Sequence, residues 1–326
     1  MTQTKPQTQT NIPFRRPESR NLQRLTTRVD KSLPTGRDGQ HVRKLANMAR
    51  NAVGVVVLCL FAVTITCSGL AALPKVEIPK GFVAPEPQPL QINEKTDRTE
   101  LLTGTVGLGL RLATSAFVLG CLAEAPRPER MLTFYDNDSS SGCRRVREMM
   151  NLLDLTYLTI PTFEGSSFPV LEDPNTGQQI AGDDAIIEHI VDAYGPPKES
   201  YDERALWPIK FRQFAIVTSW LASAIRGSPG AKRQSNARPD NGSMRPIELW
   251  AYECSPFVKP VKEKLSSLGI PHTVVSCSRG SSNRDRMVEK TGRTFQVPYI
   301  VDPNTGVDMY ESAEIVEYLD KAYTVQ

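Results

Sequence analysis

The sequence has few histidines and few cysteines, and each scarcity excludes a class of protein. The three histidines lie far apart, at His41, His189 and His272, so a metal site is not expected. Six cysteines scattered over 326 residues are too few for a secreted disulfide scaffold. The composition, 40% hydrophobic and 23% charged, is that of a globular protein. A wholly disordered chain and a polytopic membrane protein are therefore excluded.

Positive charge is concentrated at the N-terminus. Residues 1–50 carry eleven basic and three acidic residues, whereas the whole chain has a net charge of only +3. The leader, residues 1–51, is also rich in Thr, Gln, Asn and Ser, so we expect it to be disordered. This composition is similar to an organelle transit peptide, and a basic arm without a targeting role is the alternative.

An uncharged apolar stretch of 22 residues follows at 52–73. A helix of this length can cross ~30 Å of hydrocarbon. A single transmembrane helix is the favoured interpretation, and a cleaved thylakoid-transfer signal or a buried core helix are the alternatives. Residues 74–100 contain five prolines and are expected to form an extended linker.

Two later regions resemble each other. Residues 168–177, FPVLEDPNTG, pair with residues 297–306, VPYIVDPNTG, and residues 182–194 pair with 311–323 at the same offset of 129 residues. Upstream, each copy has a strand-like segment, RMLTFYD or IELWAYE, followed by an amphipathic helix. Each copy therefore predicts a parallel strand–helix–strand unit, then a hairpin whose turn is DPNTG, then a helix.

This order of elements resembles the thioredoxin fold, and more narrowly the glutaredoxin-like or glutathione S-transferase N-terminal domain. Paired copies behind a transit-like leader resemble a family of plastid proteins of plants and algae. The resemblance implies an α/β fold with two thioredoxin-like domains in tandem, a shortened one at 126–196 and a second at 247–326. It also implies that Pro169 and Pro298 are cis, and that the protein is in a chloroplast or other plastid, associated with the thylakoid membrane.

The segments that precede each of these domains are expected to be helical in part. We expect one apolar helix at 101–125, and a helix and linker at 197–246. The uncharged part of each segment is expected to pack in the core, with a position on a membrane as the alternative. Residues 227–246 are rich in Gly, Ser, Pro and Asn, which favours a flexible linker.

The redox chemistry of the resembled family needs a thiolate at the start of the first helix, where the helix dipole lowers its pKa. In the first copy Ser140 takes the attacking position and Cys143 the resolving one. In the second copy Ser255 takes the attacking position, and Cys254 lies one residue early. Dithiol exchange within either motif is thus excluded, whereas a monothiol route through Cys254 or Cys143 stays open. An inert buried thiol is the alternative for Cys143.

The glutathione-binding residues are matched better in the second copy. The resemblance implies that the backbone at Val297 and Pro298 pairs with the cysteinyl part of glutathione. Glu311 and Ser312 would receive its γ-glutamyl end, since helix N-termini suit carboxylates. A helix cap that needs no ligand is the alternative for this pair.

The first copy lacks 14 residues between Tyr157 and Pro169 that form a short helix around 283–291 in the second. One face of its sheet is expected to be partly uncovered, which leaves room for a protein partner or the neighbouring copy. No nucleic-acid partner is expected, because the basic residues belong to the leader and not to a folded face.

The functional prediction is a plastid protein that binds glutathione or a protein thiol through its second domain. Redox catalysis would be weak or absent, and the protein would act as an interaction or assembly factor. The alternative is a monothiol glutaredoxin-like or glutathione S-transferase-like enzyme that uses Cys254 or Cys143.

Overall fold

The computed structural model describes residues 76–325, except 89–91, 93, 121 and 241. The leader predicted at 1–51 and the membrane or transfer helix predicted at 52–73 lie outside the described residues. Within the described part of the chain, no helix is long and apolar enough to cross a membrane.

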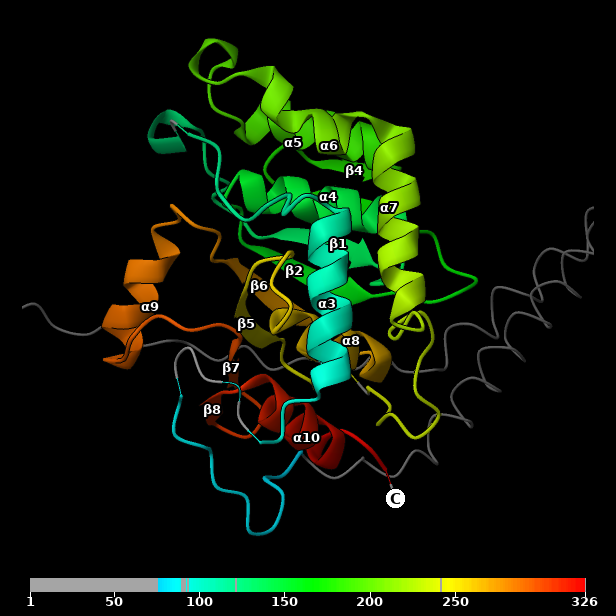
Figure 1. Cartoon of the computed structure of the whole chain (residues 1–326), viewed down its shortest axis with the longest axis vertical. Helices are drawn as coiled ribbons and strands as arrows, with labels where there is room; N and C mark the ends of the chain where they lie inside the picture. The colour runs from blue at the N-terminus through cyan, green and yellow to red at the C-terminus, as the bar shows by residue number, and fades with distance from the viewer. Residues whose placement is uncertain (1–75, 89–91, 93, 121, 241, 326) are drawn as a thin grey trace, which may run out of the picture. The chain divides into compact units, whose positions relative to one another are not determined.

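A mixed eight-stranded sheet forms the centre of the described α/β structure (Figure 1), in the order β4-β3-β1-β2-β6-β5-β7-β8. The strands are β1 Leu132–Asp136, β2 Tyr157–Pro161, β3 Val170–Asp173, β4 Gln178–Ala181, β5 Ile247–Ala251, β6 His272–Ser276, β7 Tyr299–Asp302 and β8 Val307–Tyr310. β1 and β2 are parallel, as are β5 and β6, and all other neighbours are antiparallel. We call β1–β4 with their helices the first half, and β5–β8 with theirs the second half.

The two halves meet edge to edge, where β2 pairs with β6. The backbone pairs are Tyr157–Val274, Leu158–Thr273 and Thr159–His272. Tyr157 and His272 hold the same place in their halves, because each lies opposite the first residue of its parallel neighbour. The pairing is therefore two-fold symmetric about Leu158 and Thr273.

Helices cover the two sides of the sheet unequally. They are α3 Arg98–Leu110, α4 Ser141–Leu152, α5 Asp183–Tyr194, α6 Trp207–Lys210, α7 Arg212–Ile225, α8 Val258–Leu268, α9 Asn283–Thr291 and α10 Ser312–Ala322. One core packs α4 and α5 on the first half, and a second core packs α8 and α10 on the second half. On the other side of the second half, Met287 of α9 packs with Trp250 and Tyr299.

The sequence sets the ends of the two central helices. Ser140 begins α4 as its cap, because its hydroxyl accepts a hydrogen bond from the backbone N–H of Cys143 at 3.3 Å. Val146 and Met150 then lie on the buried face of this helix. α8 ends at Gly269, whose φ of +69° is a left-handed cap that favours glycine.

Both DPNTG sequences form hairpin turns, between β3 and β4 and between β7 and β8. The turn carboxylates are buried and accept hydrogen bonds from tyrosines in, or directly after, the helix that follows each hairpin, which is α5 or α10. Asp302 accepts from Tyr318 at 2.6 Å and from Tyr323 at 2.7 Å, and Asp173 accepts from Tyr194 at 2.7 Å. The Phe168–Pro169 and Val297–Pro298 bonds are both cis, as the resemblance predicts.

The segments around the halves differ from the expectations in two respects. α3 ends at Leu110 and does not extend to 125, because the chain turns at Leu112, Ala113 and Ser115, which have positive φ. Residues 227–246 are not a free linker. The N–H of Gln234 donates to the carbonyl of Ser267 at 2.7 Å, and further backbone bonds join the segment to the C-terminal end of the chain.

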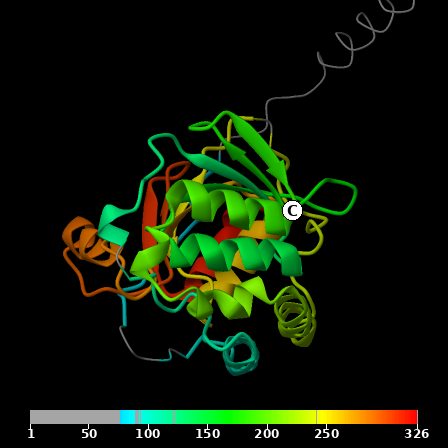
Figure 2. The ribbon, with the colours of Figure 1, turned by 90° about the horizontal axis from the view of Figure 1, so that it is seen from above.

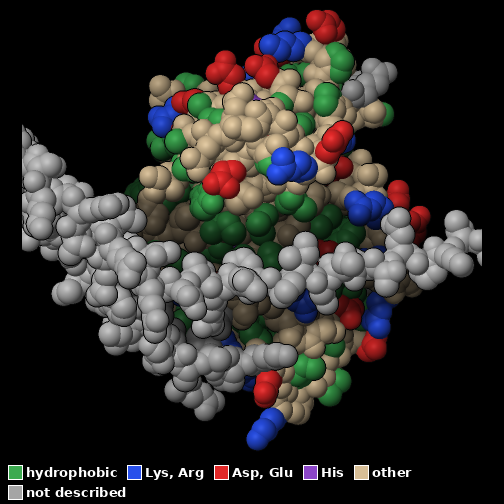
Figure 3. Space-filling view, turned by 180° about the vertical axis from the view of Figure 1, so that it is seen from behind, with side chains coloured by type: hydrophobic (Ala, Val, Ile, Leu, Met, Phe, Trp, Pro, Cys, Tyr) green, Lys and Arg blue, Asp and Glu red, His purple; other side chains and the backbone are tan. Residues whose placement is uncertain are grey.

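The first half has no helix between β2 and β3. Its side chains on the face opposite α4, such as Tyr135, Leu158 and Ile160, are therefore half-buried rather than buried. Figure 3 shows hydrophobic side chains gathered across the middle of this side of the molecule. The second half covers an edge of the first half's sheet through β6, but not this face.

Candidate functional site

The residues predicted to bind glutathione line one cavity of about 710 Å³ in the second half. Val297, Pro298, Glu311 and Ser312 form one wall, and Ser255 lies at the start of α8 on another. These residues come from three parts of the chain, and the sheet brings them together because β7 lies beside β5. The residues predicted to bind glutathione thus lie together around one cavity.

Glu311 directs its carboxylate into a polar arrangement rather than onto its own helix. It precedes α10, has a φ of +72°, and makes no side-chain cap hydrogen bond. Its Oε1 accepts hydrogen bonds from Gln296 Nε2 and from the backbone N–H of Gln88, both at 2.7 Å. The Glu311 side chain therefore does not itself cap α10, although its carboxylate is hydrogen-bonded without a ligand.

The N–H of Gln88 belongs to the segment that precedes α3. That segment is attached to the second half at further points. Glu86 is paired with Arg293 at 2.8 Å, and the ring of Phe82 contacts that of Tyr318, with centroids 5.0 Å apart. The Glu311 carboxylate thus already accepts a hydrogen bond from the backbone of the chain itself.

The far wall of the cavity is cationic and aromatic, and sequence reasoning did not find it. The guanidinium of Arg284 lies 4.2 Å from the ring centre of Phe295, and that of Arg279 lies 5.8 Å from that of Phe117. Phe117 precedes the first half, and the backbone of Val118 donates to the carbonyl of Arg279 at 2.9 Å. No local pattern links these residues, since only the tertiary structure brings Phe117 to the second half.

Ser255 and Cys254 differ in their surroundings. The side chain of Ser255 is buried, and its Oγ accepts a hydrogen bond from the N–H of Val258 at 3.4 Å. Cys254 lines a smaller cavity of about 30 Å³ between the halves, together with Arg111 and Glu148, whereas Ser255 lines both this cavity and the one beside Glu311. The one-residue displacement noted in the sequence therefore turns the sulfur of Cys254 toward the other half.

The three described cysteines are all poor candidates for a thiolate. Burial, together with the Glu148 carboxylate, raises the pKa of Cys254 to about 12. Burial also raises the pKa of Cys277 to about 12 and that of Cys143 well above its usual value. Cys143 is fully buried, so its position agrees with the inert alternative.

The matching position of the first half has a different chemistry. Gly182 and Asp183 replace the Glu–Ser pair, and the Asp183 carboxylate is paired with Arg145 and, at 3.5 Å, with Arg212. Burial opposes ionisation of Asp183, but Arg145 outweighs it and lowers the pKa. This carboxylate is already neutralised within the fold.

Two buried acids precede α4 and α8, and each is bound by the helix of the other half. Glu253 accepts two hydrogen bonds from Arg147, both at 3.0 Å, and Asp138 accepts one from Lys259 at 2.6 Å. Burial alone would raise the pKa of Glu253, but Arg147 and Lys262 hold it well below its usual range. The loops that carry redox chemistry in the resembled family thus join the two halves here.

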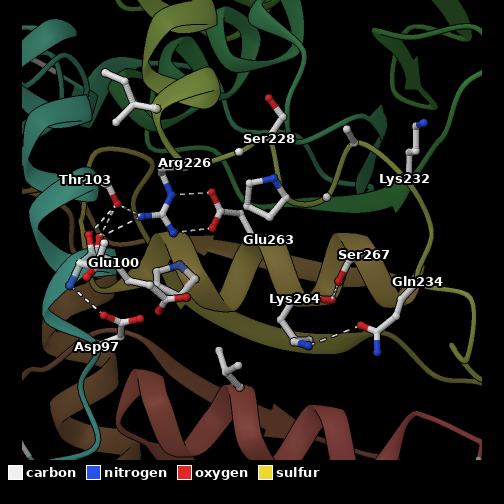
Figure 4. Close-up of a pocket in the computed structure, with 18 residues that line it drawn as sticks. Asp97, Glu100, Thr103, Arg226, Ser228, Lys232, Gln234, Glu263, Lys264 and Ser267 are labelled. Atoms are coloured by element: carbon white, nitrogen blue, oxygen red, sulfur yellow. Dashed lines mark hydrogen bonds and ion pairs between the residues drawn. The ribbon is translucent and has the colours of Figure 1, made fainter.

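A further cavity of about 830 Å³ lies where α3, α7 and α8 approach one another (Figure 4). Its charged groups largely bind each other. Arg226 donates to Glu263 at 2.7 Å and to Thr103 at 2.8 Å, and Lys264 is paired with Asp320 at 3.0 Å. The cavity beside Glu311, whose groups converge on an open space, is therefore the better candidate site.

A comparison with known families agrees with this geometry. Residues 249–325 match the glutathione S-transferase, N-terminal domain. This part of the chain has a thioredoxin-like fold, which is compatible with binding of glutathione or another thiol. The comparison with curated proteins and the comparison with solved structures each gave no match. Among the described residues, no group of His, Cys, Asp and Glu could hold a metal ion.

Proposed function

We propose that the second half binds glutathione, or a related γ-glutamyl thiol, in the cavity beside Glu311. The observation that supports this most directly is the convergence of Ser255, cis-Pro298 and Glu311 on one cavity. These are the positions that the glutathione S-transferase N-terminal domain resemblance assigns to the ligand, and the matched residues 249–325 contain all three.

The chemistry of the cavity walls suits the two ends of such a peptide. The Glu311 carboxylate can accept from the α-amino group of the γ-glutamyl end, and the N-terminus of α10 at Ser312 suits its carboxylate. The backbone of Val297 can pair with the cysteinyl part. Arg279 and Arg284 on the far wall can hold the remaining carboxylate of the ligand.

Dithiol exchange is not part of this proposal. Ser255 stands where the attacking thiol would be. Cys254 lines another cavity, and the pKa of its thiol is raised to about 12. We therefore propose an interaction or assembly factor with weak or no redox catalysis. A glutathione S-transferase-like activity is the second candidate, because Ser255, at the attacking position, lines the cavity where the ligand thiol would lie.

We also propose that the chain consists of two thioredoxin-like domains in tandem. The order of elements, both cis prolines and the symmetric β2–β6 pairing support this. An offset of 115 residues relates two further ion pairs: Arg111 donates to Glu148 at 2.9 Å, and Arg226 to Glu263 at 2.7 Å. The repeated unit would then begin with α3 in one copy and α7 in the other.

Calorimetric titration of glutathione into the full-length protein tests the binding proposal. We expect binding to the wild-type chain, and a ~10–100-fold weaker affinity in Glu311→Gln, which loses a charged hydrogen-bond acceptor. Glu289→Gln, an exposed site on α9, is the matched control and should bind like wild type. No heat of binding in the wild type, or equal affinities in both variants, would contradict the proposal.

Two further measurements separate the remaining candidates. Glutathione-dependent reduction of a mixed disulfide should be absent or weak, and turnover that is lost in Cys254→Ser or Cys143→Ser would favour the monothiol alternative. We propose a plastid location on the basis of the leader. A fluorescent fusion of residues 1–100 that stays in the cytosol would refute it.

A further inference from the structure

Exposed apolar side chains are concentrated on α3 and on the α6–α7 region. Among the described residues, sixteen large hydrophobic side chains are exposed, and nine of these lie between 102 and 112 or between 207 and 225. The most exposed of the nine are Leu102 at 65%, Trp220 at 63% and Val217 at 61%. Such a concentration is typical of an interaction surface rather than of scattered surface residues.

These side chains form a regular stripe on each helix. On α7 the exposed positions include Val217, Trp220 and Leu221, which recur at helical spacing, and on α3 they include Leu102 and Val106. Leu102 corresponds to Val217, and Val106 to Leu221, at the same offset of 115 residues. No charged residue occurs from 101 to 110 or from 213 to 225. Both stripes are therefore apolar and uncharged.

The two helices lie side by side as an outer layer. They run in opposite directions in Figure 1, and Figure 2 shows them on the outer side of the layer that contains α4. Small residues allow close approach, since a Cβ on Gly107 would lie 3.5 Å from Ala222, and Gly104 lies against Pro256. The inner faces of α3 and α7 are thus packed on the fold, as the core interpretation expects, while their outer stripes are exposed.

We propose that this outer face of α3 and α7 lies on a lipid bilayer. An uncharged helix face with an exposed tryptophan and basic residues at its end is the pattern of an interfacial membrane helix. Lys210 and Arg212 flank the start of α7, and Arg98 begins α3. A water-facing surface would be expected to interrupt each stripe with charged residues.

The position of the apolar segment in the chain favours a membrane over a second copy as the partner. Residues 52–73 have the length and composition of a membrane anchor, and 24 residues separate them from Arg98. A connector of this length spans at most ~80 Å when fully extended. The α3–α7 face would therefore stay near the bilayer that holds the anchor, and weak interfacial binding would be strengthened by the tether.

Lipid quenching of tryptophan fluorescence tests this proposal in the full-length protein. The protein is reconstituted in vesicles of phosphatidylcholine and phosphatidylglycerol whose acyl chains are brominated or unmodified. Of the three tryptophans, Trp207 and Trp220 are exposed and Trp250 is buried. We expect brominated lipid to quench the wild-type protein more strongly than Trp220→Phe.

Charge substitutions show whether the face itself is responsible. Leu102→Glu and Val217→Glu should abolish the quenching of Trp220 while the amount of vesicle-bound protein stays the same. Val288→Glu, at an exposed valine on α9, is the matched control and should leave it unchanged. Equal fluorescence in brominated and unmodified lipid would overturn the proposal. Disulfide cross-linking of Val217→Cys between copies without lipid quenching would instead assign the face to self-association.

Discussion

The substitution Glu253→Gln tests whether the two halves depend on each other through their buried charges. The Glu253 side chain is only 3% exposed, and the side chain of its partner Arg147 is fully buried. Arg144, at 3.6 Å, and Lys262 also contact this carboxylate. When Glu253 is neutralised, Arg147 keeps Asp136 and Asp138 as ion-pair partners.

The expected cost is large because a buried cation cannot regain water. Removal of one partner from a buried ion pair typically lowers the free energy of unfolding by about 3–5 kcal/mol. The exposed control Glu203→Gln, which weakens a 3.6 Å pair with Lys210, should cost about 0–1 kcal/mol. Because the halves clamp each other, we expect the variant still to unfold in one transition.

Chemical denaturation followed by circular dichroism and by tryptophan fluorescence measures both quantities. The pKa of Glu253 is lowered in the folded state, so its contribution is present above its unfolded pKa and is lost as the pH falls. The free energy of unfolding of Glu253→Gln should therefore fall less steeply than that of the wild type as the pH drops below about 4.3. A cost under about 1 kcal/mol, or separate transitions for the halves in the wild type, would refute this reasoning.

Three other predictions follow from single contacts. Gln88→Pro removes the N–H that Glu311 accepts at 2.7 Å, so calorimetry should show a ~10-fold higher affinity for glutathione; an unchanged affinity would mean that this contact does not compete with the ligand. Cys254, with its pKa raised to about 12, should be alkylated by iodoacetamide at pH 8 far more slowly in the native than in the unfolded chain, and rapid native labelling would be contrary evidence. Burial lowers the pKa of the His272 imidazole to about 4. As the pH falls, the unfolded state therefore binds a proton at this imidazole before the folded state does, and the free energy of unfolding should fall by about 3 kcal/mol between pH 6.5 and 4. His272→Asn should remove that part of the slope, and identical slopes in denaturant titrations would exclude the effect.

Much of the local structure could be predicted from the sequence. The DPNTG turns and the amphipathic helix after the first strand of each copy follow from turn residues and apolar spacing, which act within a few residues of each other. The cis state of Pro169 and Pro298 came from the resemblance and not from composition. The positions of Val297, Pro298, Glu311 and Ser312 around one cavity followed from the same resemblance.

The cavity walls and the contact between the halves could not be predicted in this way. Phe117 lies far in sequence from Arg279, and Gln88 far from Glu311, so no local pattern connects them. Arg147 and Lys259 look in the sequence like cations on the solvent face of a helix. They are buried because the two halves join at this point.

The sequence by itself determined the elements of each half and the absence of a thiol at either attacking position, because both depend on residue type and short spacing. Only the tertiary structure decided where those elements face. The β2–β6 pairing brings the two motif loops together, which buries their charges and turns Cys254 away from the Glu311 cavity. Pairing between strands 115 residues apart depends on the whole fold, and no segment carries that information alone.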